Sequence, residues 1–165
     1  MKTYKLSEIK LMDKRRQKLI DDIKNAIENK STEEEILTTA VNLIDQFSEG
    51  YNWTGFYMLR DGILEIGPYI GPETPHKKIE LNKGICGAAA SEKRTIIVDD
   101  VHADLRFLAC SISTRSELVV PLMYGDICLG EIDIDSDQPS FFNAEDEEML
   151  QIIANLIVNK LISTK

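Results

Sequence analysis

Apolar residues recur at helical spacing over the first part of the chain. Charged residues separate apolar ones across residues 7–29, and the spacing is most regular from Leu19 to Ile27. Ser31 and Glu34 have the spacing of a capping box, which predicts the start of a second helix. Its apolar face continues until Gly50 ends the pattern. We therefore expect two amphipathic helices before any strand.

The apolar period then changes to that of strands. The strands expected in chain order are residues 53–59, 63–66, 77–81, 95–98, 117–122 and 127–135. Gly and Pro residues make 67–76 a loop, and 99–114 has the composition of a long functional loop. A small-residue helix begins at Gly84, and Asn143 caps an apolar last helix. This order predicts an α+β fold, with one antiparallel sheet, terminal helices packed on one face and site loops on the other.

Length and composition narrow the class of protein. A chain of 165 residues with 43% hydrophobic residues suits one compact domain with a real core. The net charge of −9 argues against nucleic acid or an anionic membrane as partner. No apolar run approaches the roughly 20 residues of a membrane span, and the first 30 residues lack the features of a signal peptide. We expect a cytoplasmic protein whose thiols are kept reduced.

Thiols and carboxylates are concentrated in the middle of the chain. Cys86 lies at the start of the small-residue helix, where the helix dipole favours a thiolate, and Cys110 lies in the long loop. Glu117 opens a hydrophobic strand, where a buried carboxylate needs partners. Asp133 and Asp135, two residues apart, share one face of their strand. Thiols and carboxylates act in covalent and acid–base catalysis. Their concentration here therefore favours an active site over a set of acids on a solvated strand edge.

Other residues with functional side chains have a structural alternative. Cys128 is opposite in phase to the acids on an apolar strand, which predicts a packing thiol. Trp53 and Tyr57 share a strand face, where core packing and substrate contact are both open. The two histidines, His76 and His102, are far apart and no cysteine pair is close, so we expect neither a metal nor another cofactor.

Several short segments carry a resemblance to known proteins. They are Trp53-Thr54-Gly55-Phe56-Tyr57, Gly84-Ile85-Cys86-Gly87-Ala88-Ala89, Val101-His102-Ala103, Ala109-Cys110, Arg115-Ser116-Glu117-Leu118-Val119-Val120-Pro121 and Ile132-Asp133-Ile134-Asp135-Ser136. The first of them, with the order of elements, resembles a GAF domain, and the others resemble one GAF family, the free methionine-R-sulfoxide reductases. The resemblance implies a single GAF domain over residues 1–165, with residues 1–30 as an N-terminal helical extension.

The resemblance also implies a reaction. Its substrate is free L-methionine (R)-sulfoxide, which is reduced to L-methionine through a cysteine sulfenic acid and an intramolecular disulfide. Cys110 is the expected nucleophile and Cys86 the resolving thiol, although the resemblance does not settle the order of attack. Glu117 and Asp135 are the expected acid–base groups. The alternative is a non-catalytic GAF domain that senses a small molecule or the redox state.

Binding partners follow from the same comparison. Substrate contacts are expected from Trp53, Tyr57, Ile85, Asp133 and Ser116, with backbone N–H groups around Ile85 receiving the carboxylate at the helix start. Thioredoxin or a similar protein is the expected reductant. The long first helix would suit a homodimer.

One position departs from the family. Its members commonly have a third cysteine ten positions before the equivalent of Cys86, and His76 occupies that position here. The route by which the disulfide is recycled is therefore open.

Overall fold

A six-stranded antiparallel sheet forms the centre of the computed structural model, which describes residues 12–108 and 111–165. The strand order is β3-β2-β1-β6-β5-β4, and all neighbouring pairs are antiparallel. The strands are β1 (Trp53–Arg60), β2 (Ile63–Ile70), β3 (Lys78–Glu80), β4 (Ile96–Val98), β5 (Ser116–Tyr124) and β6 (Ile127–Ser136). The helices are α1 (Lys14–Ile27), α2 (Glu33–Asp45), α3 (Gly84–Glu92) and α4 (Ala144–Ser163), with a short 3-10 turn at Val101–Ala103.

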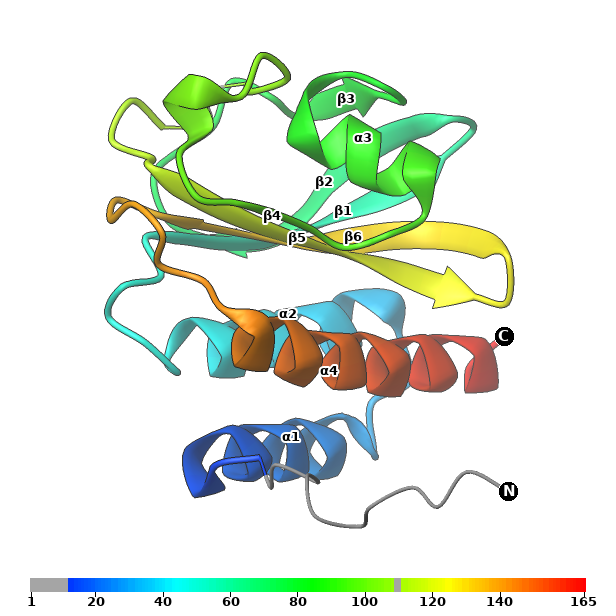
Figure 1. The fold of residues 1–165 in the computed structure, drawn as a ribbon. Coiled ribbons are helices and arrows are strands. Elements are labelled where there is room, and N and C mark those ends of the chain that lie inside the picture. The colour runs from blue at the N-terminus through cyan, green and yellow to red at the C-terminus, as the bar shows by residue number, and fades with distance from the viewer. Residues whose placement is uncertain (1–11, 109–110) are drawn as a thin grey trace, which may run out of the picture.

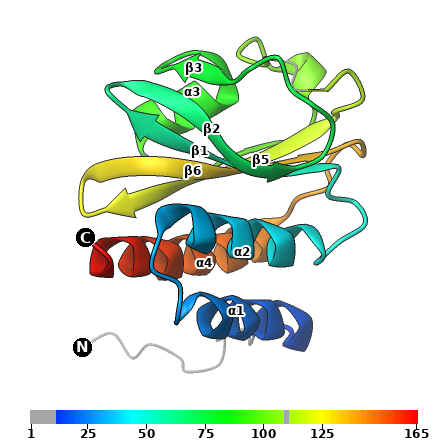
Figure 2. The same cartoon turned by 180° about the vertical axis from the view of Figure 1, so that it is seen from behind.

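The helices are divided between the two faces of the sheet. Helices α2 and α4 cover one face, and α1 lies beneath them as a further layer (Figure 1). Helix α3 and the long loops lie on the opposite face, as the view from behind also shows (Figure 2). The α+β prediction, with terminal helices on one face and loops on the other, is confirmed. None of the helices among the described residues combines the length and apolar character needed to span a bilayer.

The main core lies between the sheet and the terminal helices. Alternate residues of β5 and β6, among them Leu118 and Ile132, point into it and are fully buried. Ile153 and Ile157 of α4 meet them from the helix side. The residues between them along β5 and β6 therefore point to the opposite face, which carries α3. Burial of the apolar residues on one face thus determines which side chains lie on the other.

The start of α2 differs by one residue from the prediction. Thr32 is the N-cap, and its hydroxyl accepts from the Glu35 amide while the Glu35 carboxylate accepts from the Thr32 amide. Both Ser31 and Thr32 can cap a helix, and the Glu35 carboxylate also accepts from the Ser31 amide. The predicted Asn143 cap of α4 is confirmed.

Strand β2 is longer than expected and includes residues assigned to a loop. It continues through Gly67 and Pro68 to Ile70, with an irregular register against β1. A bulge accommodates proline because no ladder hydrogen bond is required there. Strand β3 pairs only with residues 63–65 of β2, so the part of β2 that contains Gly67 and Pro68 also lies at the edge of the sheet.

A second register shift changes the side of the sheet on which Cys128 lies. Leu122 pairs with Gly130 but the next β5 residue, Met123, pairs with Cys128, which leaves Leu129 as an extra residue. Leu129 packs towards the helix-side core, and Cys128 joins the cluster beneath α3. The predicted phase of Cys128 is therefore wrong, because strict alternation does not survive a bulge.

Candidate active site

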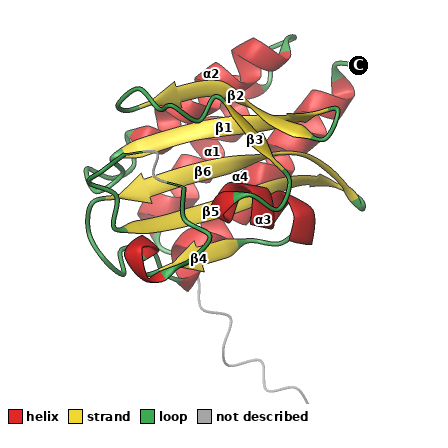
Figure 3. Ribbon diagram, turned by 90° about the horizontal axis from the view of Figure 1, so that it is seen from above, coloured by secondary structure: helices red, strands yellow, loops and turns green. Residues whose placement is uncertain are grey.

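Four carboxyl side chains line the α3 face of the central strands. Glu131, Asp133 and Asp135 alternate along β6, where Asp135 pairs with Glu117 of β5 and Asp133 with Val119. Each of the four is at most 4% exposed. Because residues two apart share a strand face, the pleat directs all four carboxyls to one side of the sheet. Helix α3 lies over β5 and β6 on one face of the sheet (Figure 3).

The thiol of Cys86 points from α3 towards these acids. Its Sγ donates to Oε1 of Glu117 at 3.8 Å. Ala88, Ala89 and Ala90 are buried beside it, and such small side chains let the helix approach the sheet closely. A thiol and a carboxyl group therefore meet in a region from which water is largely excluded.

The first residue of α3 requires glycine. Gly84 has φ of +64°, in the left-handed region that other residues rarely adopt. A Cβ atom there would also meet the Leu108 side chain at 2.9 Å. The long loop thus packs on the N-terminus of α3, which no side chain caps.

Burial and mutual repulsion favour protonated carboxyls. Burial raises the pKa of Glu117 well above its ordinary range, and the charges of Asp133 and Asp135 add to the shift. Burial likewise raises the pKa of Asp135 and of Glu131 well above their ordinary ranges, with a further contribution from the charge of Asp133. Burial raises the pKa of Asp133 to about 6, against the opposing effect of Glu117 and the Cys86 thiol. The cluster can therefore hold protons near neutral pH and release them in turn.

Three of these carboxyls have no well-aligned hydrogen bond within the described part of the chain. Both oxygens of Glu131, Asp133 and Asp135 are in this condition. Glu117 and Cys86 approach Asp133 closely enough to influence its pKa, but their geometry falls short of an aligned bond. Buried polar groups without partners are costly to fold, and such groups are concentrated where a ligand supplies the missing partners.

Aromatic rings form a wall beside the acids. Trp53 stacks on Tyr57 with ring centroids 6.0 Å apart and on Tyr69 at 5.3 Å. Gly55 lies between them, and a Cβ there would meet the Trp53 ring at 2.5 Å and the Tyr69 Cβ at 2.7 Å. Because Trp53 pairs with Asp135 and Tyr57 with Glu131, the wall and the acids share one face.

The loop after β2 is bound to this wall by two hydrogen bonds. Tyr57 Oη donates to the His76 carbonyl at 2.8 Å, and Trp53 Nε1 donates to the Pro72 carbonyl at 3.2 Å. His76, the position that departs from the resembled family, is thus attached to the site through its backbone and is half-buried.

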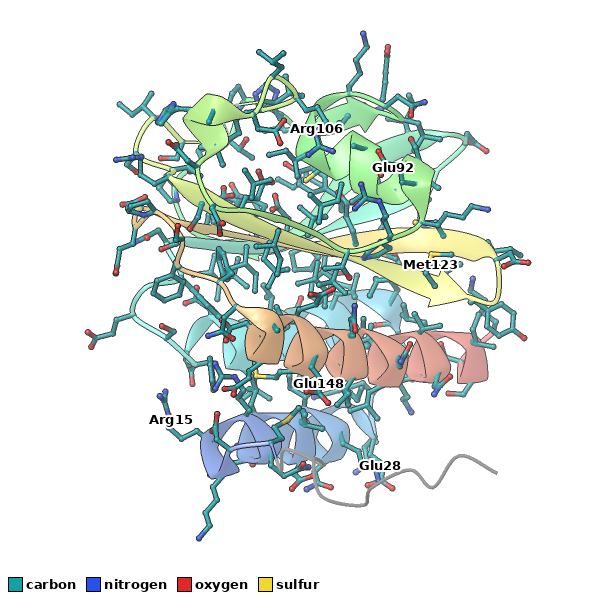
Figure 4. All side chains as sticks on the ribbon, in the orientation of Figure 1. Arg15, Glu28, Glu92, Arg106, Met123 and Glu148 are labelled. Carbon is teal, nitrogen blue, oxygen red and sulfur yellow. The ribbon has the colours of Figure 1, made fainter. Side chains whose placement is uncertain are left out.

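Cys110 lies outside the described residues. Residues on either side of it in the long loop reach the site: Leu108 packs at Gly84, and the buried Thr114 hydroxyl acts against the rise in the Asp135 pKa. Arg106 of the same loop and Glu92 of α3 lie on this face of the sheet (Figure 4). The Arg106 guanidinium donates to the Asp104 carboxylate, and this hydrogen bond is the main cause of the raised pKa of Arg106. The charges of Glu92 and Glu117 raise it further.

Comparison with known proteins places this site in a family. A GAF domain model matches residues 32–161. The free methionine-R-sulfoxide reductase of Escherichia coli is 36% identical over 114 residues, which are 68% of this chain and 67% of that protein. The enzyme of the same name from Saccharomyces cerevisiae is 41% identical over 110 residues, 64% of this chain and 61% of that protein.

A solved structure agrees over a greater length. The Staphylococcus aureus free methionine-R-sulfoxide reductase, in complex with its substrate, superposes with a TM-score of 0.83 and 34% identity, and covers 88% of this chain and 95% of that one. This chain belongs to the free methionine-R-sulfoxide reductase family. It is thus a member of a GAF-fold enzyme family. The GAF model matches from residue 32, and the assignment of residues 1–30 as an extension of the domain stays a prediction.

Most of the predicted site residues are brought together by this reductase fold. Cys86, Glu117, Asp133 and Asp135 share one buried region beside Trp53 and Tyr57, with Ile85 buried in the first turn of α3. Ser116 is on the other phase of β5, and its hydroxyl donates to the Gln138 carbonyl at 2.6 Å. The structure does not bring the Ser116 side chain to the acids.

Sequence reasoning missed two residues that the structure places in the candidate site. Glu131 has the same phase as Asp133 and Asp135, and that alternation was a signal that could have identified it. Tyr69 was assigned to a loop because Gly67 and Pro68 precede it, so its stacking on Trp53 left no signal in the pattern.

The same atoms offer a set of metal ligands. One atom each from Cys86, Glu117 and Asp133 lie within 4.8 Å of one another. A thiolate and two carboxylates are ligands that Zn²⁺ accepts. Thiol-dependent sulfoxide reduction needs thiols and protons, and we assign no step to a metal.

Proposed function

We propose that this chain reduces free L-methionine (R)-sulfoxide to L-methionine at the α3 face of its sheet, with electrons supplied by cysteine thiols. The observation that carries the proposal is the Cys86 thiol 3.8 Å from a buried Glu117, above further buried acids and beside an aromatic wall. Family membership supports the same reaction. Cys110, although outside the described residues, is proposed as the nucleophile.

The first step transfers the sulfoxide oxygen to a cysteine. The Cys110 sulfur supplies electrons, the sulfur–oxygen bond of the substrate breaks, and the oxygen remains on Cys110 as a sulfenic acid. The thiol proton is lost and one proton is gained by the transferred oxygen, so the step is balanced. Methionine is the reduced product.

Glu117 and Asp135 are proposed to manage these protons. A sulfoxide oxygen becomes basic as its bond to sulfur breaks, so a protonated carboxyl in reach lowers the barrier. Burial keeps the pKa of both groups well above the ordinary range, which supplies a proton donor near neutral pH.

The rest of the site suits a free amino acid. The Asp133 carboxylate would bind the substrate ammonium, since its pKa of about 6 leaves it ionised at neutral pH. The uncapped N-terminus of α3 around Ile85 would bind the substrate carboxylate. Trp53 and Tyr57 would contact the apolar methylthio end. Ser116 would act through the backbone at the start of β5, because its hydroxyl is engaged elsewhere.

The second step returns the enzyme to a state that a thiol reductant can act on. Cys86 is proposed to attack the Cys110 sulfenic acid, which forms a disulfide and releases water. An external dithiol, thioredoxin or a similar protein, then reduces the disulfide and is itself oxidised. Residues 1–165 would form one such unit, which a second copy could join through α1.

The main alternative to catalysis is a sensing role, and it must be distinguished by experiment. A GAF domain that senses a ligand would bind the sulfoxide without using reductant, and a redox switch would use reductant only once. We expect oxidised reductant and methionine to appear in equal amounts over many turnovers.

Blocked substrates test the pocket itself. N-acetyl-methionine sulfoxide and methionine sulfoxide amide should each lose at least about 100-fold in kcat/KM, because each leaves a buried binding group unpaired. Equal turnover of free and blocked substrates would contradict the proposed substrate class.

A further inference from the structure

Cys86, Glu117 and Asp133 bring one sulfur and two oxygen ligand atoms together from three separate elements. These atoms, from α3, β5 and β6, all lie within 4.8 Å of one another, and each side chain is at most 4% exposed. The prediction of no metal rested on the spacing of histidines and cysteines, the usual sequence signal of a zinc site. Ligands that the fold assembles from three elements leave no such signal.

The spacing of these atoms fits a tetrahedral Zn²⁺ ion. A Zn–S bond of about 2.3 Å and a Zn–O bond of about 2.0 Å at the tetrahedral angle separate sulfur from oxygen by about 3.5 Å. Cys86 Sγ and Glu117 Oε1 are 3.8 Å apart. The two values differ by about 0.3 Å, which a small rotation about side-chain bonds can absorb. An Asp133 oxygen lies within 4.8 Å of both atoms, so a rotation of its carboxyl group can complete one face of the tetrahedron.

The carboxyl groups of this set are buried without a protein cation to balance them. Both oxygens of Asp133 lack an aligned hydrogen bond within the described residues, and the side chain is 0% exposed. In the described part of the chain, none of the ion pairs includes Glu117 or Asp133. A buried carboxylate needs a cation or hydrogen-bond donors. The substrate ammonium group can supply one such partner, and a metal ion can supply another.

The thiol decides which metal ion suits the site. Mg²⁺ and Ca²⁺ prefer oxygen ligands, whereas Zn²⁺ binds thiolate sulfur as well as carboxylate oxygen. Cys86 therefore favours Zn²⁺ over the two harder ions. Three protein ligands leave the fourth tetrahedral position of Zn²⁺ to water.

We propose that the reduced protein binds one Zn²⁺ ion through Cys86 Sγ and one oxygen each of Glu117 and Asp133, and that the bound ion excludes the sulfoxide. The ligands release their protons to solvent as the ion binds, and no electron is transferred because Zn²⁺ is redox-inert. Exclusion of the sulfoxide rests on the proposed function, in which Glu117 protonates the substrate and Asp133 binds its ammonium group. Zinc thereby holds the enzyme in a reversible inactive state.

Cobalt binding tests the ligand set without any turnover. Co²⁺ occupies zinc sites, and its bond to a thiolate gives a charge-transfer band in the near ultraviolet. Reduced, metal-free protein should bind one equivalent of Co²⁺ with this band, and Zn²⁺ should displace it. Cys86→Ser should lack the band, and Asp133→Asn should weaken Co²⁺ binding at least about tenfold, a loss that even an outer-shell partner can cause. Cys128→Ser and Asp137→Asn, the latter at an exposed position, should bind Co²⁺ as the wild type does.

Alkylation of the wild type gives a second readout that needs no variant. Bound Zn²⁺ should slow the reaction of Cys86 with iodoacetamide at least about tenfold, because the metal holds the thiolate that would attack. The alkylation rate of Cys128, measured in the same sample by peptide mass mapping, should not change. Protection of both thiols or of neither would contradict the ligand set.

Competition with the sulfoxide completes the test. Reduced protein and (R)-sulfoxide are mixed without thiol reductant at buffered Zn²⁺ concentrations, and methionine is quantified. Zn²⁺ should slow methionine formation, and more sulfoxide or a chelator should restore the rate. A Co²⁺ thiolate band that persists in folded Cys86→Ser, or bound Zn²⁺ that leaves methionine formation unchanged, would overturn the proposal. A Cys86-dependent band in a metal-free protein that forms no methionine would reject the proposed function and keep the metal site.

Discussion

Glu117 of β5 lies directly across the ladder from Asp135 of β6, and both side chains are buried. Two carboxylates in such a register repel each other, so at least one is expected to carry a proton near neutral pH. Burial and the surrounding acids raise the pKa of both. The fold therefore favours a proton on this pair, beside the Cys86 sulfur, and the proposed sulfoxide reduction requires a proton donor.

Replacing Glu117 should remove this proton donor. Glu117→Gln keeps the shape of the side chain, and kcat should fall about 100-fold or more, the usual contribution of an acid–base group. Steady-state kinetics with dithiothreitol measures the loss, and circular dichroism checks the fold. Glu34→Gln, at an exposed position of α2, should keep the wild-type rate. A folded Glu117→Gln protein with wild-type kcat would show that Glu117 is structural.

Asp133 makes the stability of the protein dependent on pH. Its pKa rises from an ordinary 3.8 to about 6 on folding, so the folded state holds this proton more tightly than the unfolded state. The stability from this group is fully present below about pH 4, is lost as pH rises to about 6, and amounts to about 3 kcal/mol. Asp133→Asn should thus be more stable than the wild type at pH 8 and nearly equal to it at pH 4.

Denaturant unfolding at the two pH values measures this difference, and substrate affinity should fall in the same variant. Asp137→Asn, at an exposed position just after the site strand, is the matched control. If Asp133→Asn were less stable than the wild type at pH 8, the ionised Asp133 side chain would not be destabilising, which would contradict this prediction.

The core could be predicted from periodicity, and the correction at Cys128 shows where periodicity fails. The alternation that places Leu118 and Ile132 in the helix-side core also places Glu117, Asp133 and Asp135 on the other face. A pattern of period two holds only while register is kept. The extra residue at Leu129 is set by tertiary pairing of β5 with β6, and no local signal marks it.

The site could be predicted where the residue types themselves indicate reactivity. Cysteines and acids occur together in the middle of the sequence, so Cys86, Glu117, Asp133 and Asp135 could be predicted as candidates. Tyr69 was not, because Gly67 and Pro68 indicate a loop, whereas the bulge on the edge strand tolerates both.

The cysteines should divide into three roles. Cys110→Ser should abolish turnover, while Cys86→Ser should release about one equivalent of methionine and then stop, with a sulfenic acid trapped on Cys110. Single-turnover assays with dimedone trapping measure both. Cys128→Ser should remain active, since the Cys128 thiol is buried and bonds to the Gly130 carbonyl at 3.3 Å. A full single turnover in Cys110→Ser would reverse the assignment of nucleophile.

His76 offers a test of disulfide recycling. Thiol exchange requires access in line with one sulfur, so a disulfide at the buried Cys86 should react faster with dithiothreitol than with thioredoxin. His76→Cys should narrow that difference by forming a disulfide with Cys86 or Cys110. The Tyr57 bond is to the His76 carbonyl, so the substitution leaves that bond intact. An unchanged ratio of the two rates, with no disulfide at the introduced thiol, would mean that this position is not a lost relay.

Turnover of resolved stereoisomers tests the central claim most directly. Wild-type protein with excess dithiothreitol is given free L-methionine (R)-sulfoxide or the (S)-isomer, and methionine is quantified over time. The site predicts that the (R)-isomer is converted completely over many turnovers, with one disulfide of oxidised reductant per methionine, while the (S)-isomer remains at the level of the protein-free reaction. Binding of the (R)-isomer without methionine formation, or equal conversion of both isomers, would contradict the account.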